Sequence, residues 1–383
     1  MAATRCPYCF ELLDKRVQAF RCVNPNASAC PAQEDVRLGK YQALAPPRLQ
    51  RVIEHRVKWF RAHSVVCTCG MQTSMQICPE CHNELPAQFD TGRNSTIALI
   101  GPTFVGKSHY VAVLINELLT RVGSDFNASL TALDDQTLRR YEQNFHRPLF
   151  DQQTLIDKTR SAGAVIENKY PFVYKWAAAN GRRFQKSCAL VFFDAAGEDL
   201  DEIDKMSAQA KYIAWADGII FLFDPLQIPQ VRDRLTQLTA VPPVVTDPEV
   251  VLRSAAELIR SVQQKSPVRK INLPIAFTFS KIDAIRELLD DGSPLNRASK
   301  HAGVFDLKEQ RQVHDSMRAY LKEWLGAELT RYIDRNFSNY SYFGVSALGR
   351  EPDPDGSVWS IAPFRVEDPL LWLLHKNGLV KAR

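Results

Sequence analysis

The pattern of hydrophobic positions changes near residue 90. Beyond this point, short continuous apolar runs alternate with longer segments in which apolar residues recur at the spacing of one helix face. The spaced segments predict helices at 109–119, 248–263 and 306–325, and the runs predict buried strands at 95–100, 172–177, 187–193, 218–223, 273–279 and 342–345. This alternation is typical of an α/β fold with a doubly wound, mostly parallel sheet, which places ligands at the carboxyl ends of its strands.

One pair of strands is expected to depart from the parallel arrangement. Asn180-Gly181 separates the runs 172–177 and 187–193, and Asn-Gly between two strands is a hairpin signal. These two strands are therefore predicted to be antiparallel. Near the C-terminus, the apolar run 370–374 is predicted to be a packing helix, and docking into a partner's groove is the alternative.

The first part of the chain, 1–90, is predicted to form a separate module, with the α/β domain spanning 91–383. Within 34–64, basic residues alternate with apolar ones, which indicates an amphipathic segment with one basic side: Arg48, Arg51, Arg56, Lys58 and Arg61. One interpretation is a contact surface for nucleic acid or an acidic partner. We favour the other, a solvated helix face.

Composition adds few restrictions. The 383 residues are 45% hydrophobic and 24% charged, with a net charge of +5, so charge alone predicts neither nucleic-acid nor membrane binding. The longest apolar runs are far shorter than the roughly 20 residues of a membrane helix. The N-terminus also lacks the apolar core of a signal peptide. We therefore expect a cytoplasmic protein with no membrane contact.

Cysteines are concentrated in the N-terminal module. Eight of the nine lie in the first 81 residues: Cys6, Cys9, Cys22, Cys30, Cys67, Cys69, Cys78 and Cys81. In a cytosolic protein, paired short spacings of this kind favour metal ligands over disulfides. Four thiolates per ion leave no open coordination position, so the sequence predicts two structural zinc ions.

Which cysteines share an ion is less clear from the sequence. Sequential pairing joins the first four cysteines around one zinc and the last four around another, whereas interleaved pairing exchanges ligand pairs between the sites. Redox-active thiols and reduced structural cysteines are the alternatives to metal binding. His82 follows Cys81 directly and could replace a ligand, but we expect an exposed histidine there.

A glycine-bounded loop follows the first predicted strand of the α/β domain. The loop, Gly-Pro-Thr-Phe-Val-Gly-Lys-Ser at 101–108, matches GxxxxGK[ST] between a strand and a helix, the context that this phosphate-binding motif requires. Gly101 and Gly106 permit a tight turn of converging N–H groups, Lys107 reaches the β- and γ-phosphates, and Ser108 coordinates Mg²⁺. Val105 and His109 beside these residues complete the predicted binding loop.

A second strand end carries a carboxylate. Asp194 ends the run 187–193 and is the predicted partner of Mg²⁺, and the N–H of Gly197 can bond the γ-phosphate. The pattern DxxG is weak alone and becomes informative downstream of a phosphate-binding loop, because it completes the metal site.

Two further strand ends carry groups suited to guanine. Asp283 can accept hydrogen bonds from the N1–H and N2–H₂ groups of guanine, and the Lys281 stem can lie along the base. The sequence Ser346-Ala347-Leu348 follows the run 342–345, and its Ala347 N–H can donate to O6. Adenine offers neither the two donors together nor this acceptor, so the sequence predicts specificity for GTP and GDP, and an ATP-specific enzyme is a disfavoured alternative.

Together, GPTFVGKS, DAAG, SKID and SAL resemble the phosphate, switch, base and sugar-side motifs of the Ras-like, translation-factor-related class of P-loop GTPases, over roughly 93–350. With the Cys-Pro-Tyr-Cys knuckle and the tail 365–374, the chain resembles bacterial zinc-ribbon-bearing GTPases associated with conflict or defence systems. That resemblance implies regulatory work with protein partners. It also implies a threonine ligand to Mg²⁺ before the hairpin, for which we select Thr159; its alternative role is an exposed helix-end residue.

Two residues depart from the class. Ser280 stands where Asn or Thr is usual, and its hydroxyl is expected to tie the base loop to the phosphate loop. Glu198 stands where Ras-like enzymes use Gln to orient the attacking water, and its charge near the γ-phosphate predicts slow intrinsic hydrolysis. The catalytic residues are therefore predicted to be Lys107, Thr159 and Glu198. A nucleotide-stabilised zinc scaffold with negligible turnover is the alternative to a GTPase switch.

Overall fold

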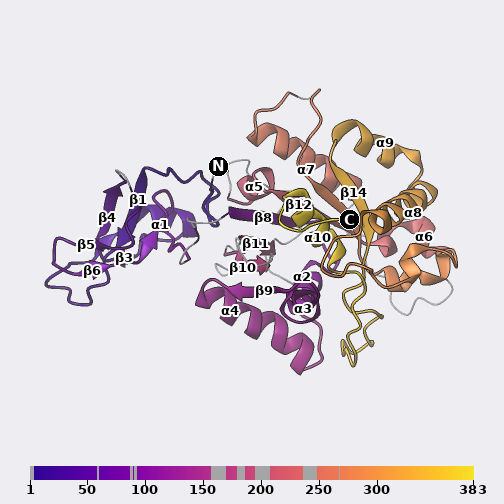
Figure 1. The fold of residues 1–383 in the computed structure, drawn as a ribbon, viewed down its shortest axis with the longest axis horizontal. Coiled ribbons are helices and arrows are strands. Elements are labelled where there is room, and N and C mark those ends of the chain that lie inside the picture. Colours follow the sequence, from indigo (N-terminus) through magenta and orange to yellow (C-terminus); the bar gives the residue numbers. More distant parts are fainter. Residues whose placement is uncertain are drawn as a thin grey trace.

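The computed structural model describes residues 4–57, 60–86, 89, 93–156, 170–178, 186–194, 208–235, 248–266 and 268–383. The cysteine-rich part lies at one side of the larger α/β domain (Figure 1). Among the described helices, none is long and apolar enough to cross a membrane.

Within the described part of the chain, a seven-stranded sheet forms the centre of the α/β domain, in the order β14-β13-β12-β8-β11-β10-β9. Its strands are β8 (Arg93–Ile100), β9 (Ala128–Ala132), β10 (Phe172–Ala178), β11 (Lys186–Asp194), β12 (Gly218–Phe223), β13 (Ile275–Phe279) and β14 (Tyr340–Gly344). Five strands run parallel, whereas β10 pairs antiparallel with both β11 and β9. The predicted doubly wound, mostly parallel sheet and its antiparallel pair are confirmed. The predicted turn at 180–181 lies outside the described residues.

Helices cover both faces of this sheet (Figure 1). They are α2 (Lys107–Leu119), α3 (Arg121–Asp125), α4 (Asp135–Tyr141), the π-helix η1 (Glu142–Asp151), α5 (Ala208–Ala214), η4 (Pro225–Gln227), α6 (Pro229–Arg232), α7 (Pro248–Val262), η5 (Ile282–Leu288), η6 (Pro294–Asn296), α8 (Leu307–Leu325), α9 (Ala327–Asn336) and α10 (Asp368–Lys376). The Asp306 carboxylate caps α8 by accepting from the N–H groups of Lys308 and Glu309. The helices predicted at 109–119, 248–263 and 306–325 are present, with ends shifted by at most two residues.

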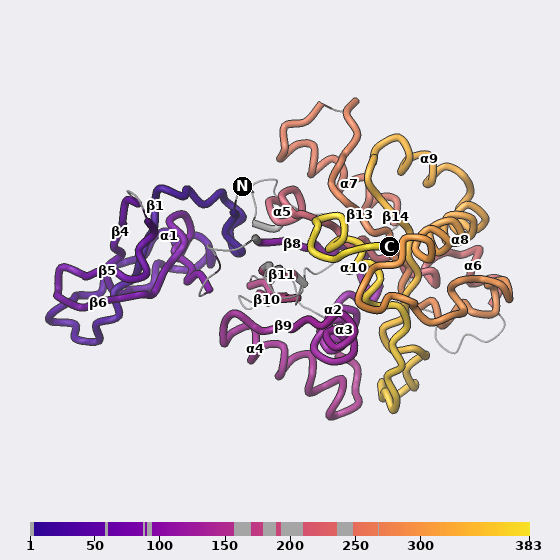
Figure 2. Tube along the Cα trace, in the orientation of Figure 1, coloured from indigo at the N-terminus to yellow at the C-terminus, as the bar shows by residue number. Residues whose placement is uncertain are grey.

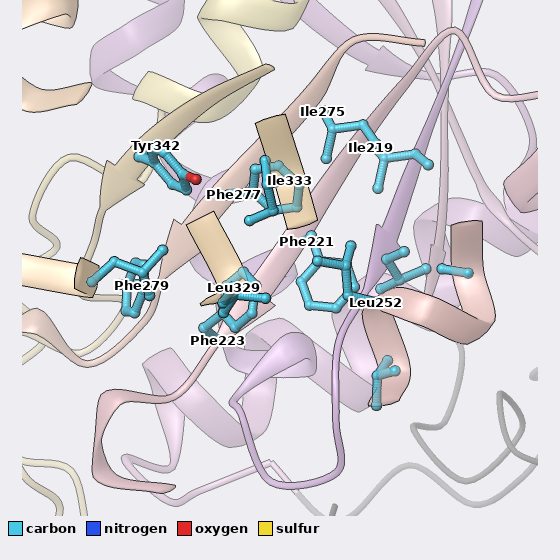
Figure 3. Close-up of a cluster of buried hydrophobic side chains, with 14 of the residues drawn as sticks. Ile219, Phe221, Phe223, Leu252, Ile275, Phe277, Phe279, Leu329, Ile333 and Tyr342 are labelled. Carbon is cyan, nitrogen blue, oxygen red and sulfur yellow. The ribbon is translucent and has the colours of Figure 1, made fainter. Parts of the chain in front are cut away.

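Alternate residues of β12 and β13 form much of one core. Ile219, Phe221 and Phe223 lie on one face of β12, because side chains two positions apart point to the same side of a strand. They pack with residues of β13, β14, α7 and α9, as Figure 3 shows: Ile275, Phe277, Phe279, Tyr342, Leu252, Leu329 and Ile333. These rings and aliphatic chains hold the strand ends in place on this side of the sheet.

The C-terminal helix closes the other face. All five residues of the run 370–374 are buried in α10, in a cluster with α2 and β8. The contact with β12 is so close that a Cβ atom on Gly218 would lie 2.8 Å from the Leu373 side chain. The predicted packing helix is therefore confirmed.

The cysteine-rich part is mostly short strands. β1 (Val17–Arg21) pairs antiparallel with β4 (Val52–Arg56) and β7 (Gln76–Ile77), and smaller pairs join β2 (Gln33–Glu34) to β3 (Arg48–Leu49) and β5 (Val65–Val66) to β6 (Gln72–Thr73). The helix α1 (Val36–Gln42) ends before Arg48, Arg51, Arg56 and Arg61 of the predicted basic side, and Lys58 lies outside the described residues. The predicted amphipathic helix face is therefore wrong. Pro46 and Pro47 follow α1, and proline cannot continue a helix, so the chain pairs as strands instead.

Candidate functional site

The glycine-bounded loop joins β8 to α2 as predicted. Gly101 has a φ of +154°, and a Cβ atom there would lie 2.5 Å from the Leu222 carbonyl oxygen, so only glycine fits. Gly106 has a φ of +85° and immediately precedes the first turn of α2. The Val105 side chain is fully buried in the core below the loop. Loop N–H groups and a helix N-terminus together favour anions here.

Lys107 lies folded over this loop. Its buried Nζ donates to the carbonyl oxygens of Gly101 and Pro102, each at 2.9 Å. The half-buried Ser108 follows in the first turn of α2. The ammonium charge is therefore held at the mouth of the loop, where it can meet a phosphate.

The predicted base loop adjoins the phosphate loop. Lys281 has a left-handed backbone conformation, and its Nζ donates to the Phe104 carbonyl oxygen at 3.2 Å and to Asp224 Oδ2 at 2.6 Å. The Ile282 N–H donates to the Val345 carbonyl oxygen at 3.1 Å, so the start of the Ser346-Ala347-Leu348 turn is also adjacent. Asp283 lies half-buried in the first turn of η5. The structure thus brings three of the four predicted segments together.

The Ser-Ala-Leu turn is itself well ordered by hydrogen bonds. Ser346 exchanges backbone hydrogen bonds with Phe364, and its Oγ accepts from the Gly349 N–H at 2.8 Å. Ser346 is buried, whereas Ala347 and Leu348 are half-buried. The turn therefore has a defined backbone at the edge of the site.

One prediction about this region is wrong. The Ser280 hydroxyl donates to the Phe223 carbonyl oxygen at 3.0 Å, at the end of β12, and not to the phosphate loop. The serine side chain is too short to extend further, because the N–H of Ser280 already holds the residue against the same Phe223 carbonyl oxygen. The tie to the phosphate loop is made instead by Lys281.

Two residues that sequence reasoning missed also hold the loops together. Asp224 is fully buried, and its Oδ1 accepts from the Leu226 N–H at 2.9 Å while Oδ2 meets Lys281. Gln227 donates from Nε2 to the Thr103 carbonyl oxygen at 3.1 Å. The available signal was a carboxylate directly after an apolar run, at the carboxyl end of a parallel strand.

His109 points from α2 toward another segment. Its Nε2 accepts a hydrogen bond from the Ile156 N–H at 3.1 Å, which requires that nitrogen to be unprotonated. Burial, and secondarily the charge of Lys281, lowers the pKa of His109 to about 4. His109 therefore connects the start of α2 to the backbone at Ile156.

The switch residues are described only in part. Asp194 ends β11 beside Leu99 of β8, one position before Ile100 and the phosphate loop, but its side chain is not among the described ones. Thr159, Gly197 and Glu198 lie outside the described residues. Their predicted roles stay predictions.

The eight N-terminal cysteines form two tetrads. The proximal tetrad is Cys6, Cys9, Cys78 and Cys81, and the distal tetrad is Cys22, Cys30, Cys67 and Cys69. The sequential pairing is therefore wrong, and the interleaved alternative is found. The strand order is the reason, since β7 pairs beside β1 and brings the second knuckle back to the first.

Both tetrads fit a zinc ion. Sulfur atoms of Cys6 and Cys81 are 3.8 Å apart, as are those of Cys9 and Cys78, and Cys22 and Cys69 are 3.6 Å apart. Four sulfurs at about 2.3 Å from a tetrahedral zinc lie about 3.8 Å from one another. The donor set and spacing thus match a structural zinc site.

Polar groups around the sulfurs support the same fit. N–H groups of Tyr8 and Glu80 donate to Cys6 and Cys78, each at 3.4 Å. The Asn24 amide also donates to the Cys69 sulfur at 3.5 Å. Donors of this kind stabilise the thiolates that a metal requires.

His82 does not belong to either tetrad. Its Nδ1 lies 2.8 Å from Asp35, whose other oxygen pairs with Arg21 at 2.5 Å. The side chain is 12% exposed, so the expected exposed histidine is wrong. The buried Asp35 carboxylate supplies the partner that places the ring in the interior.

No protein-family model matches the chain. It is 29% identical over 327 residues to a protein of Mycolicibacterium smegmatis, SaeC, named as an ESX-1 scaffolding and assembly protein; the match covers 80% of this chain and 81% of that protein.

Among solved structures, the signal recognition particle receptor SRb-GTP/SRX complex from Chaetomium thermophilum is 12% identical, with 68% of this chain and 93% of that chain covered and a TM-score of 0.28. The Ski7 GTPase-like domain of S. cerevisiae, bound to GDP and inorganic phosphate, is 12% identical, with 75% and 50% covered and a TM-score of 0.32. Nothing in these similarities bears on an association with defence systems.

Proposed function

We propose that the protein binds GTP and GDP with Mg²⁺ between the loop 101–108 and the base loop 280–283, and hydrolyses GTP slowly as a regulatory switch. One observation carries the proposal: Lys281 bonds both Phe104 of the phosphate loop and Asp224 at the end of β12. The residues predicted for phosphate and for base therefore lie at one edge of the sheet.

Each predicted residue has a distinct role in this proposal. Lys107 neutralises the β- and γ-phosphates, while Ser108 with Asp194 and Thr159 would hold Mg²⁺. Asp283 accepts from guanine, and the Ala347 N–H donates to O6. Mg²⁺ would withdraw charge from the phosphates, and Gly197 would bond the γ-phosphate of GTP but not GDP.

Hydrolysis is proposed to be slow. Glu198, in place of an amide, adds negative charge beside the γ-phosphate, where the reaction requires charge to be neutralised. A partner protein that supplies an arginine or an amide would raise the rate. Glu198→Gln is then expected to speed phosphate release without a partner.

Guanine recognition has a sharp test in Asp283→Asn. The carboxylate accepts two hydrogen bonds from guanine, whereas an asparagine amide offers one acceptor and one donor. Xanthine, which has an oxygen in place of the guanine 2-amino group, matches the amide. In fluorescence titrations with labelled nucleotides, the variant is expected to lose affinity for GDP and to gain affinity for xanthosine diphosphate. Asp291→Asn is the control. Unchanged preference for GDP would contradict the proposal.

A second candidate is a nucleotide-stabilised scaffold with negligible turnover. Its support is the relative named for scaffolding and assembly, together with two cysteine tetrads whose donor set and spacing fit structural zinc ions. Phosphate release by the wild type and by Lys107→Ala distinguishes the candidates. A switch loses measurable turnover in the variant, whereas a scaffold has none to lose.

In either case we propose that the protein is cytoplasmic and that it acts with protein partners. The basic residues near β3 and β4 leave contact with an acidic partner or with nucleic acid as a further proposal, and a shift assay with a labelled duplex in graded salt tests the nucleic-acid version. The division at residue 90 also stays a prediction, tested by limited proteolysis.

A further inference from the structure

The two tetrads differ in what surrounds them. The proximal tetrad shares a buried cluster with Val173 of β10 and with Ala189 and Val191 of β11. The cluster around the distal tetrad contains, among the described residues, only its own module: Cys22, Cys30, Cys67, Ile53, Cys69 and Met71. Within the described part of the chain, the proximal tetrad is therefore packed against the α/β domain, and the distal tetrad is not.

The residues around the first knuckle also contact α5 and Trp215, which follows it. The Arg5 guanidinium lies 3.9 Å from the centre of the Trp215 ring, and Glu11 pairs with Lys211 at 2.5 Å. Between them, the Phe10 ring, 1% exposed, packs 5.2 Å from the Tyr212 ring. Figure 2 shows the indigo N-terminal trace passing beside α5.

Tyr212 connects this contact to the phosphate-loop strand. Its hydroxyl donates to the Ile97 carbonyl oxygen at 2.7 Å and accepts from the Leu99 N–H at 3.2 Å, both in β8. β8 leads directly into Gly101. The knuckle is thus connected to the strand that positions the phosphate loop by two successive contacts, Phe10 with Tyr212 and Tyr212 with β8.

A second anchor lies at Tyr170, just before β10. Its ring meets the edges of Tyr8 and Tyr41 at centroid distances of 5.8 and 6.0 Å, and its hydroxyl accepts from the Gln42 amide at 3.0 Å. Tyr8 belongs to the knuckle itself. The cysteine-rich part therefore contacts the α/β domain both at Tyr170 and at Tyr212 of α5.

We propose that metal loading of the proximal tetrad positions β8 through Phe10 and Tyr212, and thereby sets the nucleotide affinity of the loop 101–108. A bound metal fixes the knuckle turn that presents Phe10, and without it the four cysteines lose their common tether. Among the described residues, the distal tetrad has no such contact with the α/β domain. The ligand part of this inference rests on the proposed function, whereas the effect on β8 does not.

The test compares Cys9→Ser with Cys69→Ser, a matched pair because each cysteine is half-buried and belongs to a different tetrad. Zinc content and GDP affinity are measured for both. Each variant is expected to retain about one zinc per chain. The Kd for GDP should rise about tenfold in Cys9→Ser and stay within about twofold of wild type in Cys69→Ser. Equal effects in the two variants would overturn the proposal.

A second measurement covers the case in which Cys9→Ser does not fold. Tyr212→Phe keeps the ring on Phe10 and removes both hydrogen bonds to β8, so the Leu99 amide should exchange hydrogen faster in the nucleotide-free protein. The control is Tyr342→Phe, whose buried hydroxyl has no hydrogen-bond partner in the described structure. Unchanged Leu99 exchange in Tyr212→Phe would refute the positioning role.

The exchange measurement also separates this inference from the proposed function. If the wild type binds no guanine nucleotide, the proposed function fails, while faster Leu99 exchange in Cys9→Ser but not in Cys69→Ser still supports the coupling. If the wild type binds GDP and neither the exchange nor the Kd responds to the proximal tetrad, the coupling is wrong and the proposed function stands.

Discussion

The ion pair between Lys281 and Asp224 gives a quantitative prediction for Lys281→Met. Asp224 is fully buried, and its contact with Lys281 is 2.6 Å, so methionine would leave an interior carboxylate whose remaining side-chain partner, among the described residues, is the Leu226 N–H. Removing one partner of a buried pair typically costs about 3–5 kcal/mol. Because the Lys281 side chain is 35% exposed, water reaches the pair, and we expect about 2 kcal/mol.

The double variant Lys281→Met/Asp224→Asn separates lost charge from lost packing. Asparagine keeps an oxygen for the Leu226 N–H but carries no charge, so the double variant should recover at least about 1 kcal/mol relative to Lys281→Met. Urea unfolding of the nucleotide-free protein, with equal slopes for all variants, measures the differences.

Arg318→Met is the matched control, because Arg318 pairs with Asp334 at 2.7 Å while both side chains are at least 40% exposed. It should cost less than about 0.5 kcal/mol. The reasoning would be refuted if the double variant were as unstable as Lys281→Met, or if the control cost as much as Lys281→Met.

Three further predictions concern the loop, the metal sites and pH. Gly101→Ala should abolish GDP binding in calorimetry, because the new Cβ would lie 2.5 Å from the Leu222 carbonyl oxygen; retained affinity would show that the loop can shift. Cys9→Ser/Cys78→Ser should retain about one zinc per chain by elemental analysis, since both ligands belong to one tetrad, whereas complete loss would contradict the interleaved pairing. Burial lowers the pKa of His301 to about 4, so between about pH 6.5 and 4 the unfolded chain binds more protons than the folded chain. The urea midpoint of unfolding should therefore fall as the pH is lowered from 6.5 to 4, and it should fall less steeply in His301→Gln.

The strands that apolar runs predicted are those with continuous burial. β12 and β13 are buried at every residue, so their sequences carry an unbroken signal. β9 was missed because it is an edge strand, and of its five residues only Leu130 is buried. An edge strand needs little apolar surface, and its pairing with β10 is decided by register rather than by its own composition.

The candidate site divides in the same way. The loop 101–108 could be predicted from the sequence, because its glycines are required by the local backbone conformation and form part of a known motif. The hydrogen-bond partners of Asp224 and Ser280 could not be predicted, because they depend on which strand ends are adjacent in three dimensions. Cysteine pairing failed for the same reason, since β1 lies between β4 and β7 and carries Cys22 away from the first knuckle.

Buried charge at this edge of the sheet has a consequence for ligand binding. Asp224 and the Phe104 carbonyl oxygen fix the Lys281 ammonium, and the carbonyl oxygens of Gly101 and Pro102 fix the Lys107 ammonium. Lysine loses much rotamer freedom when it is ordered, so a site that orders its lysines in advance binds with a smaller entropic cost. The two lysines differ in what a ligand must displace. Lys107 donates to backbone carbonyl oxygens and can turn to a phosphate, whereas Lys281 would have to leave a buried carboxylate. The base loop should therefore keep its conformation when nucleotide binds, and the phosphate loop should be the part that rearranges.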